Sequence, residues 1–419
     1  MITQKEAAIH SARRHASAYL VALSIFSGAS LCQAADAPPY AALLSQALTQ
    51  APELLERRAD VSAAAADAAQ AGAWLNPRLD AVVENLGAPA SGGQSQRQNT
   101  YTLTQPLELM GKRGARIEAG ERNILVAQSR QRQAQVAFAY ELALAYATVE
   151  AAQARAGLAK EDLSRATDDV NAAKAQVKAG KEAGLRLAQA QASASATQAA
   201  RQAAEADVVQ ALARLSALVG SSEPYTGISE SLLTKAQAPA AALAGETPAV
   251  ATARAEREAL EAQARVEQKR WLPEVGLSAG LRRYGWTSES GYVIGISTSI
   301  PIFDRNSSAV VAANERIAAA EARLAAASFA AEATRRSAQA QSSAAEQRLI
   351  AATEGERAAS EAYRLGRIGY DSGKTSLMEL LAIRRTLSDA KGLTIEARLA
   401  RVRALAALAQ ADGRLAFGD

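Results

Sequence analysis

The feature that most constrains this 419-residue chain is a long pattern that occurs twice. The stretches "AGAWLNPRLDAVVENLG" (residues 71–87) and "EQKRWLPEVGLSAGL" (residues 267–281) both pass from a helical sequence through Trp-Leu and proline into an alternating strand. Further landmarks recur in the same order, about 195 residues apart: Trp74 and Trp271, Pro106 and Pro301, Gly180 and Gly373. Landmarks that repeat in order at a nearly constant spacing indicate a duplicated structural unit.

Each unit is predicted to hold the same series of elements. The first repeat, residues 35–220, and the second, residues 248–413, each comprise a helix, two strands, a long helix and a returning helix. The predicted bounds are 52–74 and 248–271 for the first helices, 77–86, 99–109, 274–284 and 291–303 for the strands, 113–178 and 305–368 for the long helices, and 183–219 and 375–412 for the returning helices. Residues 221–247 are predicted to be a linker because Pro, Gly, Ser and Thr interrupt the helical pattern there, and 414–419 a C-terminal tail.

The predicted strands have one apolar and one polar face. Along 99–109, for example, tyrosine and leucines alternate with threonines and a glutamate. Strands of about ten residues with this alternation are typical of a membrane β-barrel. A half-buried sheet packed on helices explains the alternation equally well, so the strands alone leave both interpretations open.

The long helices favour the barrel. Residues 113–178 would span on the order of 100 Å as a helix, which a four-stranded sheet cannot shelter. Four strands also cannot close into a barrel, since about eight make a small one. Hydrophobic residues make up 49% of the chain but aromatic residues only 4%, which suits long, closely packed helices. We therefore expect other copies of the chain to complete the barrel and pair with its free strand edges.

The N-terminus is predicted to be an export signal, residues 1–34. Basic residues precede an apolar stretch, and "CQA" at 32–34 offers small residues for cleavage after Ala34. A short buried helix, or a lipid attached to Cys32, are the alternatives. Removal of the signal would lower the net charge from +4 to +2, because three cationic residues and one acidic residue leave with it. Nothing in that charge indicates a nucleic-acid partner.

Neither a metal site nor a catalytic group is expected in the mature chain. The only cysteine and both histidines lie within residues 1–34, whereas tight sites for zinc, cobalt or copper use imidazole or sulfur ligands. No plausible base accompanies the serines, and there is no phosphate-binding loop. We therefore expect a non-enzymatic protein without a cofactor.

Aromatic residues and prolines mark the predicted strand ends. The residues expected at a membrane interface are Trp74, Trp271, Tyr101, Tyr284, Trp286 and Tyr292. Pro106 and Pro301 are expected at the junctions between strand and helix. A basic patch of Lys112, Arg113 and Arg116 at the first junction is interpreted as a solvated or lipid-headgroup-contacting face, or as a substrate contact.

These residues resemble a known family. "NPRLDAVVENLG" together with "YTLTQPLELMGKRGARIEAGER" (101–122) resembles the outer-membrane efflux proteins of the TolC type. Gln105 to Leu109, leading into Gly-Lys-Arg at 111–113, is most similar to the heavy-metal branch that serves cobalt–zinc–cadmium pumps, the CzcC-like proteins. The resemblance covers essentially the whole mature chain. It implies a mostly α-helical protein with membrane β-structure in the outer membrane.

The same resemblance implies an assembly and its partners. Three chains would share a twelve-stranded barrel in outer-membrane lipid and a coiled-coil tunnel in the periplasm. The partners would be a periplasmic adaptor protein and an inner-membrane pump of the RND class. Residues at the two helical tips would meet the adaptor: Gly180, Lys181, Tyr370, Gly373 and Lys374.

Candidates for a gate in the lumen follow from the resemblance as well. Glu379 falls where family members carry an acidic residue near the closed end, and a ring of three carboxylates would attract cations. Ser376 to Glu379 is also a helix capping box, so the two roles stay open. Arg186 occupies the matching position in the first repeat and would contact Glu379. Asp371 is a further candidate for the lumen.

Three functions are compatible with the sequence. The first is a passive conduit that exports divalent heavy-metal cations of the cobalt, zinc and cadmium type. The second keeps the fold but exports drugs or a secreted protein. The third is a periplasmic coiled-coil scaffold with no role in the membrane.

Overall fold

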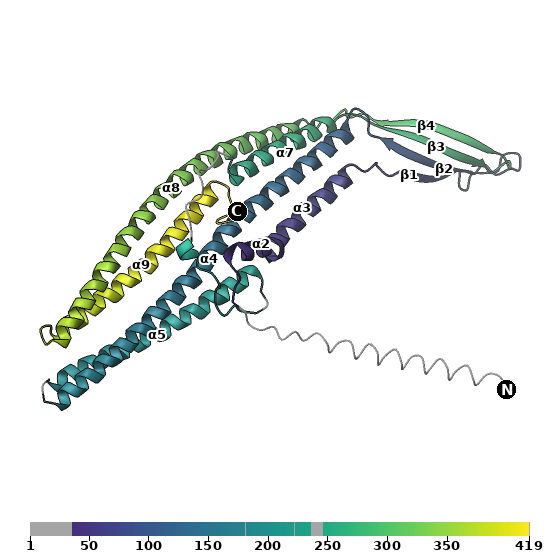
Figure 1. Cartoon of the computed structure of the whole chain (residues 1–419). Helices are drawn as coiled ribbons and strands as arrows, with labels where there is room; N and C mark the ends of the chain where they lie inside the picture. Colours follow the sequence, from purple (N-terminus) through teal and green to yellow (C-terminus); the bar gives the residue numbers. More distant parts are fainter. Residues whose placement is uncertain (1–35, 181, 222, 236–245, 419) are drawn as a thin grey trace, which may run out of the picture.

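The computed structural model describes residues 36–180, 182–221, 223–235 and 246–418. The predicted signal, residues 1–34, and residues 236–245 of the predicted linker lie outside them. The elements follow in the order α2 (Tyr40–Gln50), α3 (Pro52–Ala71), β1 (Arg78–Glu84), β2 (Gln98–Leu107), α4 (Lys112–Lys178), α5 (Gly184–Val219), α6 (Leu232–Lys235), α7 (Pro248–Arg270), β3 (Glu274–Tyr284), β4 (Ser290–Ser299), α8 (Ser307–Asp371) and α9 (Leu377–Ala411). Figure 1 shows the strands at one end of an elongated molecule and the helical tips at the other.

The internal repeat is visible in the backbone. Elements α3–β1–β2–α4–α5 recur as α7–β3–β4–α8–α9. Left-handed backbone conformations also recur at matching positions: Gly111 and Asn306 before the long helices, Gly180 and Gly373 at the tips, Gly220 and Gly413 after the returning helices. The predicted duplication is confirmed.

The four strands form one antiparallel sheet in the order β1-β2-β3-β4. The two hairpins join through β2 and β3, where Tyr101 lies opposite Leu281. Because side chains alternate across a sheet, this register places most of the apolar residues of the four strands on one face and most of the Thr, Ser and Gly residues on the other. The outer edges of β1 and β4 have no partner strand within the sheet.

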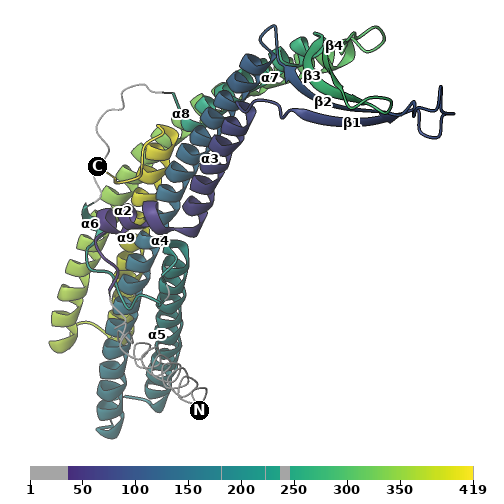
Figure 2. The same cartoon turned by 90° about the vertical axis from the view of Figure 1, so that its right-hand side faces the viewer.

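Two helical hairpins extend from the sheet (Figures 1 and 2). Helix α4 spans about 100 Å and packs along α5, and α8 packs along α9 in the same way. The shorter helices α3 and α7 cover the sheet-proximal parts of α4 and α8, and α4 joins the two repeats by packing against α7 and α9. Many residues at these contacts are alanines, so the helix axes approach closely.

The hydrophobic core lies at the middle of the helices. There α2, α6 and the C-terminal residues 412–418 pack around α4 (Figure 2), with Phe138, Leu142 and Tyr146 fully buried. The Tyr40 hydroxyl donates to the carbonyl oxygens of Ala139 and Ala416, at 3.0 and 2.7 Å. Burial raises the pKa of this phenol well above its ordinary value. Tyr40 thus ties the N-terminal helix and the C-terminal segment to α4.

A carboxylate on α4 orients the short helix α6. The Glu150 carboxylate accepts hydrogen bonds from the backbone N–H groups of Leu232 and Leu233, at 2.8 and 2.9 Å. Carboxylates at a helix N-terminus satisfy N–H groups that have no partner within the helix. Neither α2 nor α6 was predicted from the sequence.

Among the described residues, no helix combines the length and apolar character required to cross a bilayer.

Candidate functional site

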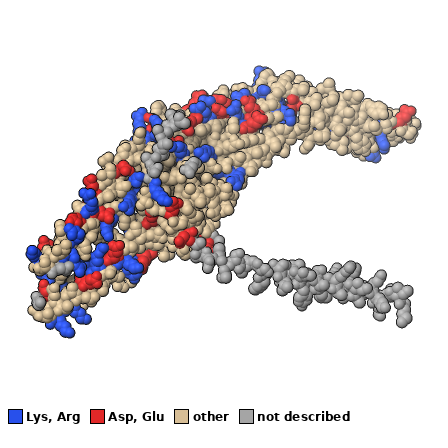
Figure 3. Space-filling view, viewed as in Figure 1, with Lys and Arg blue, Asp and Glu red and all other residues tan. Residues whose placement is uncertain are grey.

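One face of the sheet is a highly exposed apolar surface. On β4, Tyr292, Ile294 and Ile296 are 86, 81 and 76% exposed, and Leu79 on β1 is 70% exposed. Figure 3 shows that charged side chains crowd the visible helical surface and are sparse over the strands. A contiguous apolar surface of this kind marks contact with an apolar medium or a partner. The opposite face carries Thr, Ser, Gly and several charged residues.

The aromatic residues predicted for a membrane interface lie on or beside the sheet. Trp74 and Trp271, 67 and 49% exposed, stand where α3 and α7 lead into the strands. At the far end the rings of Tyr284 and Trp286 are 4.7 Å apart. Tyr101 and Tyr292 extend from the apolar face and are exposed. The aromatic residues therefore lie toward both ends of the strands, and their role at an interface stays a prediction.

Two arginines of the predicted basic patch fix the first junction. Arg113 donates to the Gly72 carbonyl oxygen from Nε and Nη2, at 2.9 and 2.5 Å, and its guanidinium lies 5.0 Å from the Trp74 ring. Arg116 donates to the Ala71 carbonyl oxygen and pairs with Glu108 at 2.8 Å. These cations satisfy the last carbonyl groups of α3, where a helix dipole is negative. From the sequence, the patch was predicted to be a solvated or lipid-headgroup-contacting face or a substrate contact, and this clamp was not predicted.

The prolines predicted at the junctions occupy different places. Pro106 lies within β2, opposite Gly276, one residue before the strand ends. Pro301 follows the end of β4. At the second junction the Asn306 side-chain amide donates to the carbonyl oxygen and the carboxylate of Glu267, at 2.9 and 2.8 Å. Near the end of α7 a side-chain amide therefore donates to a helix carbonyl oxygen, whereas at the end of α3 guanidinium groups do so.

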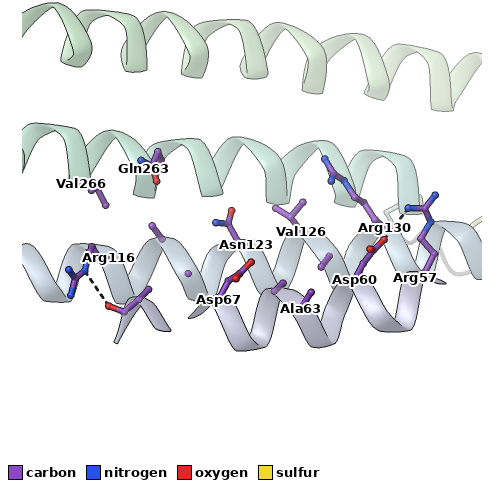
Figure 4. Close-up of a pocket in the computed structure, with 15 residues that line it drawn as sticks. Arg57, Asp60, Ala63, Asp67, Arg116, Asn123, Val126, Arg130, Gln263 and Val266 are labelled. Atoms are coloured by element: carbon purple, nitrogen blue, oxygen red, sulfur yellow. Dashed lines mark hydrogen bonds and ion pairs between the residues drawn. The ribbon is translucent and has the colours of Figure 1, made fainter. Parts of the chain in front are cut away.

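A groove of about 700 Å³ lies between α3, α4 and α7 (Figure 4). Two of its arginines are paired: Arg57 with Asp60, which also lines the groove, at 3.2 Å, and Arg130 with Glu256 at 2.6 Å. Alanines line much of the rest. Among the described residues, no three His, Cys, Asp or Glu residues are grouped so that they could hold a metal ion. The groove has the character of a solvated helix interface.

The two helical tips are linked by a hydrogen bond. Gln176 Nε2 donates to the Tyr370 hydroxyl at 3.1 Å, so α4 and α8 meet close to their ends. Gly180 and Gly373 adopt φ of 68° and 74°, which suits the reversal of the chain there. Lys374 is exposed. Lys181 lies outside the described residues, and Asp371 is the last residue of α8. Docking by these residues stays a prediction.

Glu379 and Arg186, two of the gate candidates, lie close to the tips and contact different partners. Ser376 caps α9, with its hydroxyl accepting from the Glu379 N–H at 3.3 Å. Glu379 is exposed. Arg186 lies 3.7 Å from the carboxylate of Glu182, four residues before it. Within one chain, Arg186 therefore pairs inside its own repeat, and a gate ring of Glu379 stays a prediction.

A ladder of polar contacts between α4 and α9 was not recognised from the sequence. Asp169 pairs with Arg384, and both side chains are largely buried. Further contacts on the ladder join Arg155 with Glu396, Glu161 with Lys391, and Asp162 with Ser388. Because the partners are more than 200 residues apart in sequence, only the folded chain reveals them. The ladder ties the returning helix of the second repeat to the long helix of the first.

The environment of the ladder perturbs two of its carboxylates in opposite directions. Burial raises the pKa of Asp169, against the opposing pull of Arg384 and Arg367. The hydrogen bond from Lys391 lowers the pKa of Glu161. For Asp169, burial removes water from the charged form and so disfavours it. For Glu161, the hydrogen-bond donor stabilises the charged form.

Comparisons with known proteins agree with this architecture. The family described as "Outer membrane efflux protein" matches residues 43–221 and 240–414. A solved structure of CusC superposes with a TM-score of 0.78 at 20% identity, covering 90% of this chain and 92% of that one.

Three curated relatives are also similar. The chain is 60% identical to the nickel-cobalt-cadmium resistance protein NccC of Alcaligenes xylosoxydans xylosoxydans, over 95% of this chain and 92% of the relative. It is 63% identical to the nickel and cobalt resistance protein CnrC of Cupriavidus metallidurans, over 93% of this chain and 94% of the relative. Similarity to the cobalt-zinc-cadmium resistance protein CzcC of the same organism is 30%, over 58% of each chain. With both repeats matched and the two-faced sheet joined to long helical hairpins, the chain belongs to the outer membrane efflux protein family.

Proposed function

We propose that this chain is the outer-membrane conduit of a system that exports divalent metal cations, with nickel and cobalt as its main cargo. The observation that supports nickel and cobalt as the cargo is the 63% identity to a nickel and cobalt resistance protein over 93% of the chain. The relative named for zinc is matched at only 30% identity over 58% of the chain. Nickel therefore joins the cobalt, zinc and cadmium that the sequence alone suggested, and nickel and cobalt come before zinc.

The faces of the sheet support a role as a conduit. The apolar face would contact lipid, and the Thr, Ser and Gly face would line water. Because the chain offers no grouped metal ligands among its described residues, cations would pass without being captured. The energy for export would come from a pump in the inner membrane.

The unpartnered edges support assembly into a trimer. The four-stranded sheet ends in free edges at β1 and β4, and three copies would supply twelve strands. Five exposed apolar residues of α8 lie on one side of the helix, within a sector of about 60° around its axis: Val311, Phe329, Ile350, Leu365 and Ile368. The buried alanines of α8 lie on its other side: Ala313, Ala320, Ala338, Ala345 and Ala359. A helix that is apolar on both sides requires a second partner.

A head-to-tail contact would satisfy both edges at once. Helix α8 lies at one edge of the helical layer, and α3 and α5 lie toward the other, where Leu185 and Val209 are 67 and 68% exposed. A contact between two different surfaces closes into a ring when the rotation between copies permits. The tips would then face the periplasm, where an adaptor would bind them. A groove of about 890 Å³ between α5 and α9 offers a further surface for its helices.

Deletion of the gene in its host tests the cargo. We expect tolerance of Ni²⁺ and Co²⁺ to fall several-fold and both metals to accumulate in the cell, measured by growth inhibition and elemental analysis. The intact gene restores tolerance, and a copy with a premature stop codon serves as the control. Unchanged metal tolerance combined with sensitivity to drugs or detergents would favour a multidrug conduit instead. Recovery of the protein in the soluble periplasmic fraction would favour a scaffold.

A further inference from the structure

The polar face of the sheet carries nearly all the charges of the strands. Strands β1 to β4 contain six charged residues, and the register places five of them on the face that bears Thr100, Thr102 and Thr104. These five are Arg78, Asp80, Glu84, Glu274 and Arg282. Arg283 lies on the opposite face. If the polar face lines the pore, as the proposed function holds, these five residues set the electrostatic potential of the barrel.

Arg282 and Glu84 form a pair at the end of the sheet that is remote from the helices. Arg282 Nη2 lies 3.7 Å from Glu84 Oε2, and Arg282 Nε donates to the Thr100 hydroxyl at 3.0 Å. Thr100 is 7% exposed and fixes the guanidinium on the strand surface. The Arg282 and Glu84 side chains are 35 and 46% exposed, so both still face the open side of the sheet. Figure 1 shows that this end carries the hairpin loops and not the helices.

The other charges of this face are matched as well. Arg78 pairs with Asp80 at 3.0 Å, and Glu274 pairs with Lys112 at 3.5 Å, both toward the helical end. On the polar face, small side chains (Thr, Ser and Gly) occupy most of the strand positions between the two ends. The polar face is therefore close to neutral, and Arg282 would be the one uncompensated charge of this face at the outer end of the strands if Glu84 were neutral.

We propose that Glu84 keeps the outer mouth of the barrel permeable to divalent cations by neutralising Arg282. In a trimer, three Arg282 side chains would otherwise form a positive ring where the cargo leaves. A divalent ion feels twice the repulsion of a monovalent ion from such a ring. Rings of charged side chains set the ion selectivity of pores in this manner. The hydrogen bond from Arg282 Nε to the hydroxyl of Thr100 on β2 holds the Arg282 side chain on this face.

The range of the effect gives it a distinctive salt dependence. Charges in a water-filled pore act over a Debye length of about 30 Å at 0.01 M salt and about 3 Å at 1 M. An unpaired Arg282 ring would therefore affect ions across the pore in dilute salt and hardly at all in concentrated salt. A change in pore width would persist at both concentrations.

Single-channel recording of the purified full-length protein in a neutral lipid bilayer tests this inference. We expect Glu84→Gln to lower the ratio of K⁺ to Cl⁻ permeability by about twofold or more in dilute KCl, with little change at 1 M. NiCl₂ as the only salt should show a parallel loss of cation current. Arg282→Gln should shift the ratio in the opposite direction, and the double variant should return near the parent value.

Glu354→Gln is the matched control, because Glu354 is exposed on α8, about 70 Å along the helix from its sheet-proximal start. It removes the same charge more than two Debye lengths from the outer mouth in dilute salt and should leave the ratio unchanged. A Glu84→Gln channel with the parent selectivity in dilute KCl would overturn the inference. If Glu84→Gln does not assemble, an unchanged ratio in Arg282→Gln would overturn it equally. Absence of any channel from the parent protein would instead contradict the proposed function.

Discussion

At the scale of single residues, the structure assigns roles that depend on partners far away in the sequence. Arg113 and Arg116 satisfy carbonyl groups of α3, about 40 residues earlier in the chain. Asp169 and Arg384 are both largely buried and compensate each other. A basic or acidic residue on a helix surface looks the same in sequence whether it is solvated or paired. The difference lies in what the fold places opposite it.

The Glu161–Lys391 pair predicts a defined response to acid. Lys391 Nζ donates to the Glu161 carboxylate at 3.0 Å, and this bond lowers the pKa of Glu161 from its ordinary 4.5. A lowered folded-state pKa means that the contribution to stability is present above pH 4.5 and is lost as the pH falls through the folded-state value. We expect thermal unfolding measured between pH 3 and 7 to show a smaller acid-induced fall in Tm for Glu161→Gln than for the parent.

The control for this experiment is Glu289→Gln, which removes a carboxylate from the β3–β4 loop and not from the ladder. Its acid-induced fall in Tm should match that of the parent. The same fall in Glu161→Gln and in the parent would show that the Lys391 contact does not contribute.

At the scale of elements, the predicted helices and strands are all present, with bounds that differ by a few residues. Alternation and helical spacing are local properties, so the sequence reveals them directly. The helix α2 was missed because its eleven residues gain their stability from the C-terminal segment and α4, through contacts such as those of Tyr40. The predicted repeat boundaries, 35–220 and 248–413, stay predictions.

The ends of the returning helices provide a test of the repeat geometry. Gly413 has φ of 73°, and a Cβ there would lie 2.6 Å from Cδ of Pro248, which starts α7. We expect Gly413→Ala to destabilise the protein by about 1–3 kcal/mol, because an L-residue is strained at positive φ and the proline cannot recede freely. Thermal unfolding in detergent measures the effect.

Gly157→Ala is the matched control for this prediction. Gly157 is helical and exposed on α4, with nothing within 4 Å of an added Cβ. The same substitution should stabilise the protein by about 0.5–1 kcal/mol there, since alanine loses less entropy in a helix. Equal effects at the two sites would refute the clash with Pro248.

At the scale of the whole molecule, one chain leaves large surfaces without a partner. The apolar face of the sheet, the edges of β1 and β4, and the outer side of α8 remain exposed in the isolated protein. Under the proposed function, the apolar face of the sheet would contact lipid. The edges of β1 and β4 and the outer side of α8 would contact neighbouring copies of the chain. The isolated chain is therefore one segment of a larger assembly under the proposed function.

A charge on the outer side of α8 tests the proposed trimer. Phe329 is 79% exposed in the single chain, so Phe329→Glu disturbs no packing within it. We expect this variant to shift the purified protein from trimer to monomer in mass measurements in detergent, because a carboxylate would be buried between copies. Ser328→Glu, about 100° around the same helix, is the control and should remain trimeric. A fully trimeric Phe329→Glu protein would place the contact between copies elsewhere.

The sequence by itself determined the duplication, the kinds of element, the two-faced strands and the family, because each is recorded in local spacing or in motifs such as those at 101–122. Only the tertiary structure decided which charges are paired: Arg113 with the end of α3, Asp169 with Arg384, and Glu84 with Arg282. The physical reason is that a charge takes its energy and its function from what lies within a few ångströms of it. That neighbourhood is created by folding over separations of tens to hundreds of residues.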